Sequence, residues 1–425
     1  MFKWNVMYLK EIREVLNDEK KARPTLIQER TYDALKNGES IVGLAKTGTG
    51  KTLAYGLPIL ERAREIGGLA VILEPTSELA VQTKNVLLPY VKALGLKSIA
   101  LVGAGNRNRQ MEQLKKEKPS ILIATPGRLF DFISAKKINY QDIKALVIDE
   151  ADDILEFAKL DLLSALGQNL SSDAQIVLFG ASESSITKNC ETIFERSFFL
   201  IDVRSEQKLA VKHYFLQVSN EYKIQFLQRL TKLDKFKGLI FFSSNESQMR
   251  FARIVAHTKM RFAILNNEMD KTVQKNILTS FQKGKVNLLF VTDLIARGLD
   301  LSEVTYVVNF EIPDDANTYL HRSGRTGRMN NAGYVVNLGD DHDFRKLKKM
   351  IAPVEVKQVY FKGYQLVTEK PLQKAKDKKV VSMSETKKKG KKKNANLRKK
   401  MLFVAIICQL LIFTFIFIML NTAFK

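Results

Sequence analysis

The sequence has few of the residues that usually hold metal clusters or cross-links. Its 425 residues include two cysteines, Cys190 and Cys408, and four scattered histidines. Two cysteines cannot build a disulfide framework or the usual four-ligand zinc site, so no metal cluster is expected. Residues 1–10 also lack an apolar run long enough for a signal peptide. We therefore expect a reducing, cytoplasmic setting.

Acidic residues are also in deficit. Asp and Glu number 45 against 68 Lys and Arg, which leaves a formal net charge of +23. The excess is concentrated in residues 370–400, which hold 14 basic and 2 acidic residues. Such a segment is typical of chains that bind polyanions, and its lack of large apolar side chains predicts disorder. The alternative is that the segment only keeps the chain in solution.

The rest of the composition is typical of a globular protein, with 45% hydrophobic and 27% charged residues. Residues 1–369 alternate short β-branched apolar runs with longer amphipathic stretches, which predicts two tandem α/β domains with parallel sheets. The polar stretch 204–210 is the expected linker between them. The runs expected to be buried strands are 40–45, 69–73, 98–102, 120–124, 143–148, 175–179, 238–242, 262–265, 286–292, 304–310 and 333–338.

A glycine-rich segment follows the apolar run Ile41–Leu44. It reads Ala45-Lys46-Thr47-Gly48-Thr49-Gly50-Lys51-Thr52. Glycines let backbone N–H groups converge on phosphates, and the start of a following helix adds partial positive charge. In such a loop Lys51 would reach the β- and γ-phosphates of a nucleotide, and Thr52 would ligate Mg²⁺. A glycine-rich turn before an ordinary helix is the alternative.

The acidic tetrapeptide Asp149-Glu150-Ala151-Asp152 ends the apolar run Ala145–Ile148. A carboxylate at the end of a strand beside a phosphate loop is where an NTPase holds Mg²⁺, which favours Asp149 for that role. Glu150 would orient and deprotonate a water molecule for attack on the γ-phosphate. Without the loop upstream, a solvated helix start would be the better interpretation.

A third motif, His321-Arg322-Ser323-Gly324-Arg325-Thr326-Gly327-Arg328, lies in the second domain. Arg325 and Arg328 are three residues apart, so on a helical turn they would share a face. Their guanidinium groups would then stabilise charge on the γ-phosphate across a cleft, as arginine fingers do. A basic surface helix is the alternative, which the two glycines disfavour.

The order of these motifs resembles that of the DEAD-box RNA helicases, small bacterial members in particular, over about residues 20–340. The resemblance implies two tandem RecA-like domains with ATP and RNA bound between them. It also implies that ATP hydrolysis with Mg²⁺ closes the lobes and melts short RNA duplexes with little sequence specificity. Ribosomal RNA or mRNA would be the partner of a monomeric catalytic unit.

The resemblance also assigns further site residues and domain boundaries. Gln28 would read adenine, and Gly298 and Asp300 would contact ATP from the second lobe. The RNA-backbone contacts would be Pro75, Thr76, Gly103, Gly105, Thr125, Gly127, Arg128, Ser243 and Thr292. The expected divisions are an adenine-reading segment at 1–30, lobes at 31–203 and 211–369 with the linker 204–210 between them, a basic tail at 370–400 and an apolar helix at 401–420.

Several positions depart from the pattern of the family. Ser77 stands where the family has an arginine, and Gly180-Ala181-Ser182 replaces a Ser-Ala-Thr segment that couples the lobes. Asn266-Asn267-Glu268 replaces His-Gly-Asp, and Ala104 interrupts a glycine pair. Glu11 stands 17 residues before Gln28, where an aromatic usually stacks on adenine. These changes leave an alternative open, an RNA-binding clamp or assembly factor with weak ATPase activity and little unwinding.

Residues 401–420 contain no charge, and Gln409 and Thr414 are their polar interruptions. As a helix they would span about 30 Å, the thickness of the hydrocarbon core of a bilayer. The segment predicts a transmembrane helix that anchors cytoplasmic lobes to the membrane, with Arg398–Lys400 beside anionic lipid. The alternatives are a buried core helix and an incidental extension.

Overall fold

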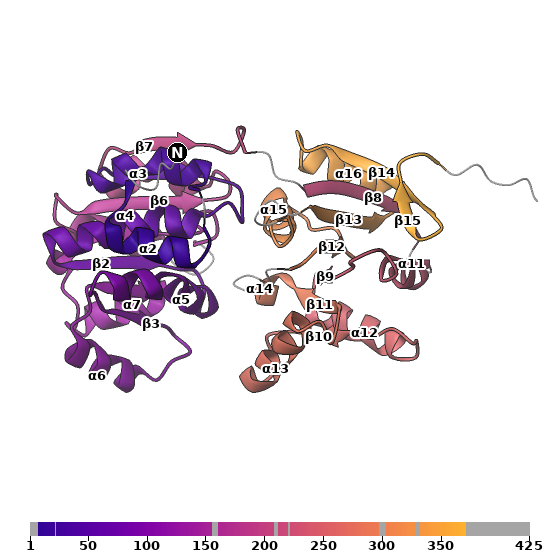
Figure 1. Cartoon of the computed structure of the whole chain (residues 1–425), viewed down its shortest axis with the longest axis horizontal. Helices are drawn as coiled ribbons and strands as arrows, with labels where there is room; N and C mark the ends of the chain where they lie inside the picture. The colour runs from indigo at the N-terminus through magenta and orange to yellow at the C-terminus, as the bar shows by residue number, and fades with distance from the viewer. Residues whose placement is uncertain are drawn as a thin grey trace, which may run out of the picture. The chain divides into compact units, whose positions relative to one another are not determined.

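The computed structural model describes residues 7–21, 23–154, 160–207, 211–219, 222–296, 303–327 and 332–370. Its helices, labelled in Figure 1, are α2 Lys10–Asp18, α3 Leu26–Lys36, α4 Lys51–Ile66, α5 Ser77–Ala93, α6 Arg107–Glu117, α7 Pro126–Ser134, α8 Leu160–Asn169, α9 Ser185–Lys188, α10 Cys190–Phe194, α11 Lys223–Leu230, α12 Asn245–Ala256, α13 Lys271–Gln282, α14 Asp293–Ala296, α15 Ala316–Ser323 and α16 Asp341–Met350. The strands are β1 Ile41–Leu44, β2 Leu69–Leu73, β3 Ser98–Leu101, β4 Ile121–Ala124, β5 Ile143–Ile148, β6 Gln175–Gly180, β7 Phe199–Asp202, β8 Val211–Gln217, β9 Gly238–Phe242, β10 Ala263–Ile264, β11 Leu288–Thr292, β12 Tyr306–Asn309, β13 Gly333–Gly339, β14 Val356–Lys362 and β15 Gln365–Val367.

The strands form two sheets, one in each half of the described chain. The first sheet has the order β3-β4-β2-β5-β6-β1-β7, and the second has the order β10-β11-β9-β12-β13-β8-β14-β15. All neighbouring strands pair in parallel except β14 and β15, which are antiparallel. The prediction of two α/β domains with parallel sheets is confirmed.

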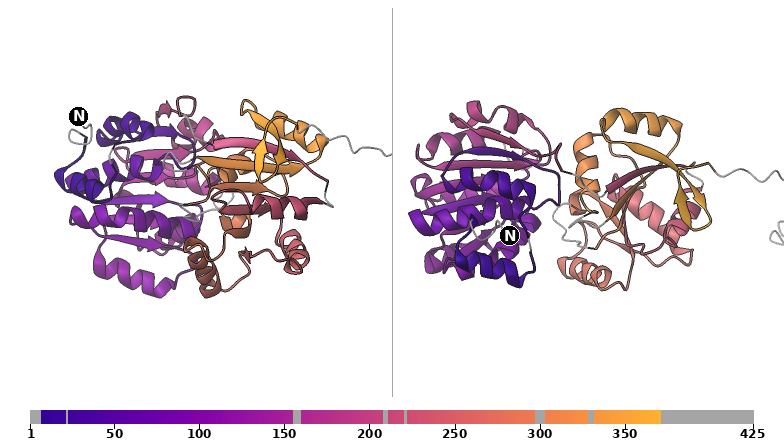
Figure 2. Two further views of the ribbon diagram at one scale, coloured as in Figure 1. Left: turned by 45° about the vertical axis from the view of Figure 1, so that its right-hand side comes forward. Right: turned by 45° about the horizontal axis from the view of Figure 1, so that its top comes forward.

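Each sheet carries a hydrophobic core on both of its faces, because helices cover both (Figure 2). Side chains alternate along a strand, so Ile41 packs with helices α2 to α5 on one face while Val42 packs with helices α7 to α10 on the other. Strands buried on both faces need continuous apolar runs, which is why these runs could be recognised as strands in the sequence.

The expected runs coincide with most of the strands, and β2, β5 and β9 match them residue for residue. Three pieces of sheet were not anticipated: β7, β8 and the β14–β15 hairpin. All lie toward the end of a sheet, where one edge or face is less covered. In β7, for example, Phe199 and Leu200 are exposed. Strands of this kind lack the continuous buried run that identifies a central parallel strand.

The membrane-anchor prediction for 401–420 requires correction. Within the described ranges, no helix is long and apolar enough to cross a bilayer. The longest helix described, α5, has 17 residues and keeps a polar side, as a helix that covers a sheet does. Residues 401–420 themselves, and the basic stretch 371–400, lie outside the described residues.

Candidate functional site

The strand order explains how distant motifs meet. Strands β5, β6 and β1 are neighbours, so the segments that follow them lie at one edge of the first sheet: Asp149–Asp152, Ala181–Ser182 and the phosphate loop. Strands β3, β4 and β2 are also neighbours, and the predicted RNA contacts at Gly103, Thr125 and Pro75 follow them. The carboxyl edge of a parallel sheet is thus divided into a nucleotide half and an RNA half.

The phosphate loop connects β1 to α4. Gly50 precedes the helix with φ of 95°, a conformation that L side chains rarely adopt. A Cβ at Gly50 would also lie 2.7 Å from Nε2 of Gln28. That nitrogen donates to the Gly50 carbonyl over 3.1 Å, while Oε1 of Gln28 accepts from the Thr25 backbone N–H over 2.8 Å. Gln28 therefore joins the start of α3 to the phosphate loop.

Lys51 and Glu150 form a buried ion pair, with 3.2 Å between Nζ and Oε2. Burial opposes the charge on Lys51, but Glu150, Asp149 and Asp152 outweigh it and raise the Lys51 pKa. Burial likewise pushes the pKa of Glu150 upward, but Lys51 and His321 hold that pKa below its ordinary value. Both groups are therefore charged at neutral pH.

Asp149 is buried beside this pair. Its carboxylate accepts from the Tyr55 hydroxyl over 2.7 Å and from the Glu150 backbone N–H over 2.8 Å. Burial and the neighbouring Glu150 raise the pKa of Asp149 to about 6. Each carboxylate oxygen retains a lone pair, and the Thr52 hydroxyl lies in the first turn of α4. This all-oxygen donor set fits Mg²⁺, which would also relieve the repulsion between the two acids.

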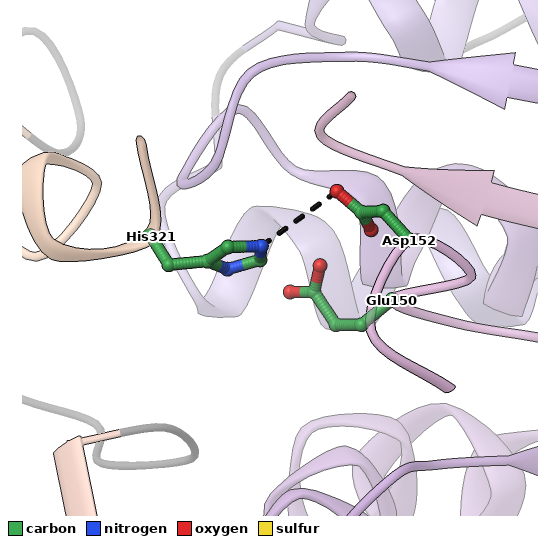
Figure 3. A group of neighbouring side chains, drawn as sticks. All are labelled: Glu150, Asp152 and His321. Carbon is green, nitrogen blue, oxygen red and sulfur yellow. Dashed lines mark ion pairs between the residues drawn. The ribbon is translucent and has the colours of Figure 1, made fainter. Parts of the chain in front are cut away.

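His321, from α15 of the second lobe, reaches the acidic tetrapeptide of the first (Figure 3). Its Nε2 lies 3.6 Å from Asp152 and 3.3 Å from Asp153, within ion-pair range. Burial lowers the pKa of His321, but the carboxylates of Asp152, Glu150 and Asp153 outweigh burial and raise it.

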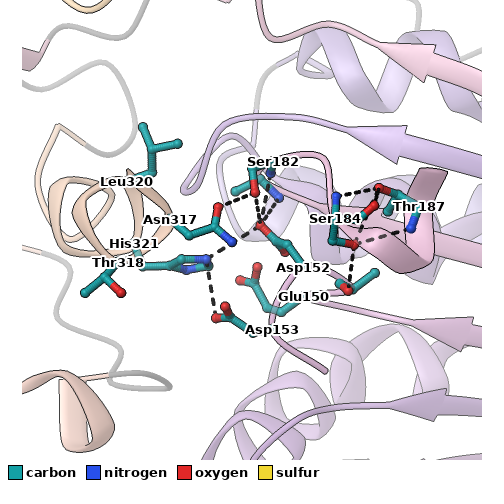
Figure 4. Close-up of polar contacts among 12 residues, drawn as sticks. Glu150, Asp152, Asp153, Ser182, Ser184, Thr187, Asn317, Thr318, Leu320 and His321 are labelled. Atoms are coloured by element: carbon teal, nitrogen blue, oxygen red, sulfur yellow. Dashed lines mark hydrogen bonds and ion pairs between the residues drawn. The ribbon is translucent and has the colours of Figure 1, made fainter. Parts of the chain in front are cut away.

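Ser182 forms a second link between the lobes (Figure 4). One oxygen of Asp152, Oδ2, accepts from the Ser182 N–H over 3.0 Å and from its hydroxyl over 2.9 Å. The same hydroxyl contacts Oδ1 of Asn317, on α15. The other oxygen of Asp152, Oδ1, is buried with no hydrogen-bond partner. The Gly180-Ala181-Ser182 segment therefore still connects the lobes through Ser182, although one carboxylate oxygen is unsatisfied.

Arg325 is buried at the interface and lies beyond the end of a helix. Helix α15 ends at Ser323, and Arg325 lies in the turn that follows because Gly324 and Gly327 favour turns. The charge of Arg325 is one of those that lower the pKa of Glu150. A Cβ at Gly324 would lie 2.3 Å from Cβ of Thr47, so the second lobe closely approaches the phosphate loop. Arg328, Gly298 and Asp300 lie outside the described residues.

A cavity of about 400 Å³ lies at the RNA half of the edge. Its lining residues are Pro75, Thr76, Ser77, Glu78, Gly103, Thr125, Pro126 and Gly127 from the first lobe and Asn267, Lys271 and Ile295 from the second. Five of the nine predicted RNA contacts are thus brought together in one groove between the lobes.

The other four predicted RNA contacts are not part of this lining. Arg128 donates from Nη2 to the carbonyl oxygens of Gly103 and Gly105, over 3.0 and 3.2 Å, so it holds that loop in place. The Ser243 backbone N–H donates to Glu311 over 2.7 Å. The Thr292 hydroxyl lies 3.4 Å from Asn245 Oδ1 and is buried.

Some site residues had no signal in the sequence. Asn317 and Lys271 act across the lobes, and only the three-dimensional arrangement brings them to their partners. Gln207, in the expected linker, accepts from the Lys46 N–H over 2.8 Å and from its Nζ over 2.7 Å. Gln207, within the described part of the expected linker, therefore contacts the phosphate loop.

Glu11, which stands in the sequence where the family has an adenine-stacking aromatic, forms an ion pair in the structure. It pairs with Arg64 over 2.8 Å, near the end of α4. Arg64 is 13 residues beyond Lys51, or about 20 Å along a helix, so Glu11 is remote from the phosphate loop. Neither side chain is fully buried, so the pair is a surface contact.

Fold and site together define a two-lobed P-loop ATPase whose second lobe contributes groups to the nucleotide site. The description "DEAD/DEAH box helicase" matches residues 25–189, and "Helicase conserved C-terminal domain" matches residues 222–330. The chain is 33% identical to the "Probable ATP-dependent RNA helicase YfmL" of Bacillus subtilis, over 81% of this chain and 93% of that one. It is 31% identical to the "DEAD-box ATP-dependent RNA helicase CshC" of Bacillus cereus, over 85% and 91%.

A solved structure, S. cerevisiae Dbp5 bound to RNA and ADP BeF3, is similar with a TM-score of 0.72 and 26% identity, over 84% of this chain and 94% of that one. The chain belongs to the DEAD-box ATP-dependent RNA helicases. It is accordingly an ATP-hydrolysing enzyme, and ATP is its nucleotide.

Proposed function

We propose that this helicase completes its ATPase site by joining groups from both lobes and uses that closure to hold and locally melt RNA. One observation carries the proposal: Lys51 and Glu150 of the first lobe lie beside His321 and Arg325 of the second. Neither lobe alone contains the full set, so hydrolysis depends on how the lobes are arranged.

ATP entry would rearrange the buried ion pair. In the structure, Lys51 and Glu150 neutralise each other over 3.2 Å. A triphosphate carries more negative charge than a carboxylate, so it would draw the Lys51 ammonium to its β- and γ-phosphates. Glu150 would then be free to accept a proton from a water molecule. Breaking the ion pair would thus leave Lys51 bound to the phosphates and Glu150 available as the base.

The remaining roles follow from position. Gln28 and the backbone of residues 45–50 would hold the base and phosphates, and Thr52 and Asp149 would hold Mg²⁺. The metal would supply positive charge to the phosphates. Arg325, together with Arg328, would stabilise charge that develops on the γ-phosphate.

RNA would bind in the groove between the lobes. The first-lobe wall is made of a hydroxyl-bearing and glycine-rich edge, which suits contacts to sugar and phosphate rather than to base edges. Because such contacts do not read the bases, sequence specificity should be low.

The retained Ser182 link between Asp152 and Asn317 favours coupled unwinding over the weak-ATPase clamp.

Replacing Glu150 with Gln tests this proposal. The amide cannot accept the proton of water, so we expect the RNA-stimulated ATPase rate to fall by about 10²–10⁴ while ATP binding is retained. Steady-state phosphate release and nucleotide titration measure the two effects. The control is Glu355→Gln, an exposed acid that pairs with Lys357. An unchanged rate in the Glu150 variant would contradict the assigned role.

A further inference from the structure

The described part of the expected linker, residues 204–207, forms a turn against the first lobe. The Gln207 backbone N–H donates to the Val203 carbonyl over 3.1 Å, and the Val203 side chain is buried in the core of that lobe. The Val203 N–H donates in turn over 3.0 Å to the carbonyl of Leu44, the last residue of β1. The turn is therefore attached to the strand that leads into the phosphate loop.

Gln207 contacts Lys46 of the phosphate loop with both its side chain and its backbone. Its Oε1 accepts from the Lys46 N–H over 2.8 Å, and its carbonyl oxygen accepts from the Lys46 ammonium over 2.7 Å. The neighbouring Ala45 N–H donates to the Gly180 carbonyl over 3.1 Å. The first part of the loop is thus held by β6 and by the linker, which leaves the N–H groups of the glycine-rich part for phosphates.

The same part of the loop faces the second lobe. The charge of Lys46, together with burial as the larger cause, lowers the pKa of His213 on β8 to about 4. Nδ1 of His213 lies 2.8 Å from the hydroxyl of Tyr319 on α15. A Cβ at Gly324, just after α15, would lie 2.3 Å from Cβ of Thr47. The linker turn, β8 and α15 therefore meet at the start of the phosphate loop.

We propose that Gln207 is a positioning residue for ATP, which fixes the phosphate loop and the start of the second lobe relative to each other. The inference rests on the proposed closure of the lobes over ATP. The bond from the Lys46 N–H to Gln207 forms only when the linker turn lies against the loop, so it favours the arrangement of the lobes that completes the site. ATP contacts both lobes in that arrangement and is bound more tightly as a result.

Replacing Gln207 with Met keeps the length of the side chain but removes the acceptor. The Lys46 N–H then loses its hydrogen bond, so KM for ATP should rise about three- to ten-fold. The value of kcat should stay within about two-fold of the parent, because the bond acts on binding and not on the reacting groups. Gln207→Glu keeps an acceptor oxygen at the same length and should restore KM to within about two-fold of the parent.

RNA binding supplies a second readout. The gain in RNA affinity on addition of AMP-PNP should fall in Gln207→Met by a factor similar to the rise in KM, because coupling between two ligands is reciprocal. Phosphate release at saturating RNA gives KM and kcat, and fluorescence anisotropy of a labelled oligouridylate, with and without AMP-PNP, gives the gain.

Gln358→Met in the full chain is the matched control. The Gln358 side chain also forms an exposed hydrogen bond, from Nε2 to Oε1 of Gln217 over 3.1 Å, but it joins β14 to β8 within the second lobe. Melting temperature verifies that each variant is folded.

Three results would overturn the inference. The first is a KM in Gln207→Met no higher than in Gln358→Met. The second is a Gln207→Glu variant as impaired as Gln207→Met, since the acceptor oxygen would then be irrelevant. The third is an unchanged gain in RNA affinity, which would separate the linker contact from the arrangement of the lobes. A parent chain whose RNA affinity does not respond to AMP-PNP would instead contradict the proposed closure itself, and the inference with it.

Discussion

At the scale of single residues, Asp152 is the clearest example of an incompletely satisfied group. Its Oδ2 accepts from Ser182, whereas its buried Oδ1 has no hydrogen-bond partner. A Cβ at Gly180 would lie 3.1 Å from that Oδ1. Gly180, which stands where the family has a serine hydroxyl, therefore lies beside the unsatisfied Oδ1 of Asp152.

We predict that Gly180→Ser stabilises the protein relative to Gly180→Ala. Both variants add the same Cβ at a position where φ suits any residue, but serine can also donate to Asp152. A hydrogen bond to a charged carboxylate is worth about 1.5–3 kcal/mol, so the serine variant should be more stable by this amount. Urea unfolding followed by circular dichroism measures the difference. Equal stability of the two variants would show that Oδ1 is satisfied in another way.

Local motifs were enough to locate the nucleotide residues. Lys51, Asp149 and Glu150 follow strands whose apolar runs are evident, so the motif and its place in the fold could be inferred together. Asn317 and Lys271 could not be found this way, because each acts on a residue more than 130 positions away. No periodicity or spacing records such a contact.

At the scale of secondary-structure elements, α15 is held in position by one buried arginine. Arg322 donates from Nε and Nη2 to the two oxygens of Asp293, over 2.6 and 2.7 Å. Its Nη1 also donates to Asn309 and to the Glu311 carbonyl, over 3.0 and 2.8 Å. The arginine thus joins the helix that carries His321 to the ends of β11 and β12.

We predict that Arg322→Ala destabilises the second lobe by about 3–5 kcal/mol, because Asp293 and Asn309 lose their shared partner. Arg322→Lys should recover little of this, since an ammonium cannot bind both carboxylate oxygens in the same way. Urea midpoints measure the effect, with the exposed Arg250→Ala as control. A loss no larger than that of the control would mean that α15 is held by its apolar contacts.

The limits of prediction at this scale lie at the sheet edges. Central strands such as β5 are buried on both faces, so their composition alone identifies them. The exposed strand β7 has no such run, and the β14–β15 hairpin extends the second sheet beyond the expected strands. Helix α15 ends at Ser323, before Arg325, which agrees with the glycines at 324 and 327 disfavouring a helix there.

At the scale of the whole molecule, the described site residues all lie between Gln28 and Arg325, within the unit that spans residues 1–370. Residues 371–400, which follow this unit in the sequence, are rich in lysine and include none of the predicted site residues. Lysines without interleaved aromatic residues add affinity for phosphates but do not read sequence.

We predict that a chain ending at Lys370 retains RNA-stimulated ATPase activity, because the catalytic groups remain. The dependence of log RNA affinity on log salt should become markedly flatter, since fewer counterions are released when fewer lysines bind. Anisotropy titrations over a range of KCl concentrations measure the slope. A slope equal to that of the full chain would mean that the basic stretch only keeps the protein in solution.

The order of the lobes along the chain has a consequence for biosynthesis. The seven strands of the first sheet all lie within residues 41–202, so this sheet and both of its cores are complete in sequence before the second lobe is translated. Domains that are contiguous in this way fold as units during synthesis, the N-terminal one first. The emerging first lobe would already carry Lys51 and Glu150, whereas Arg325 is added more than 100 residues later. A nascent chain on the ribosome would thus be able to hold nucleotide well before it could complete the site that hydrolyses it.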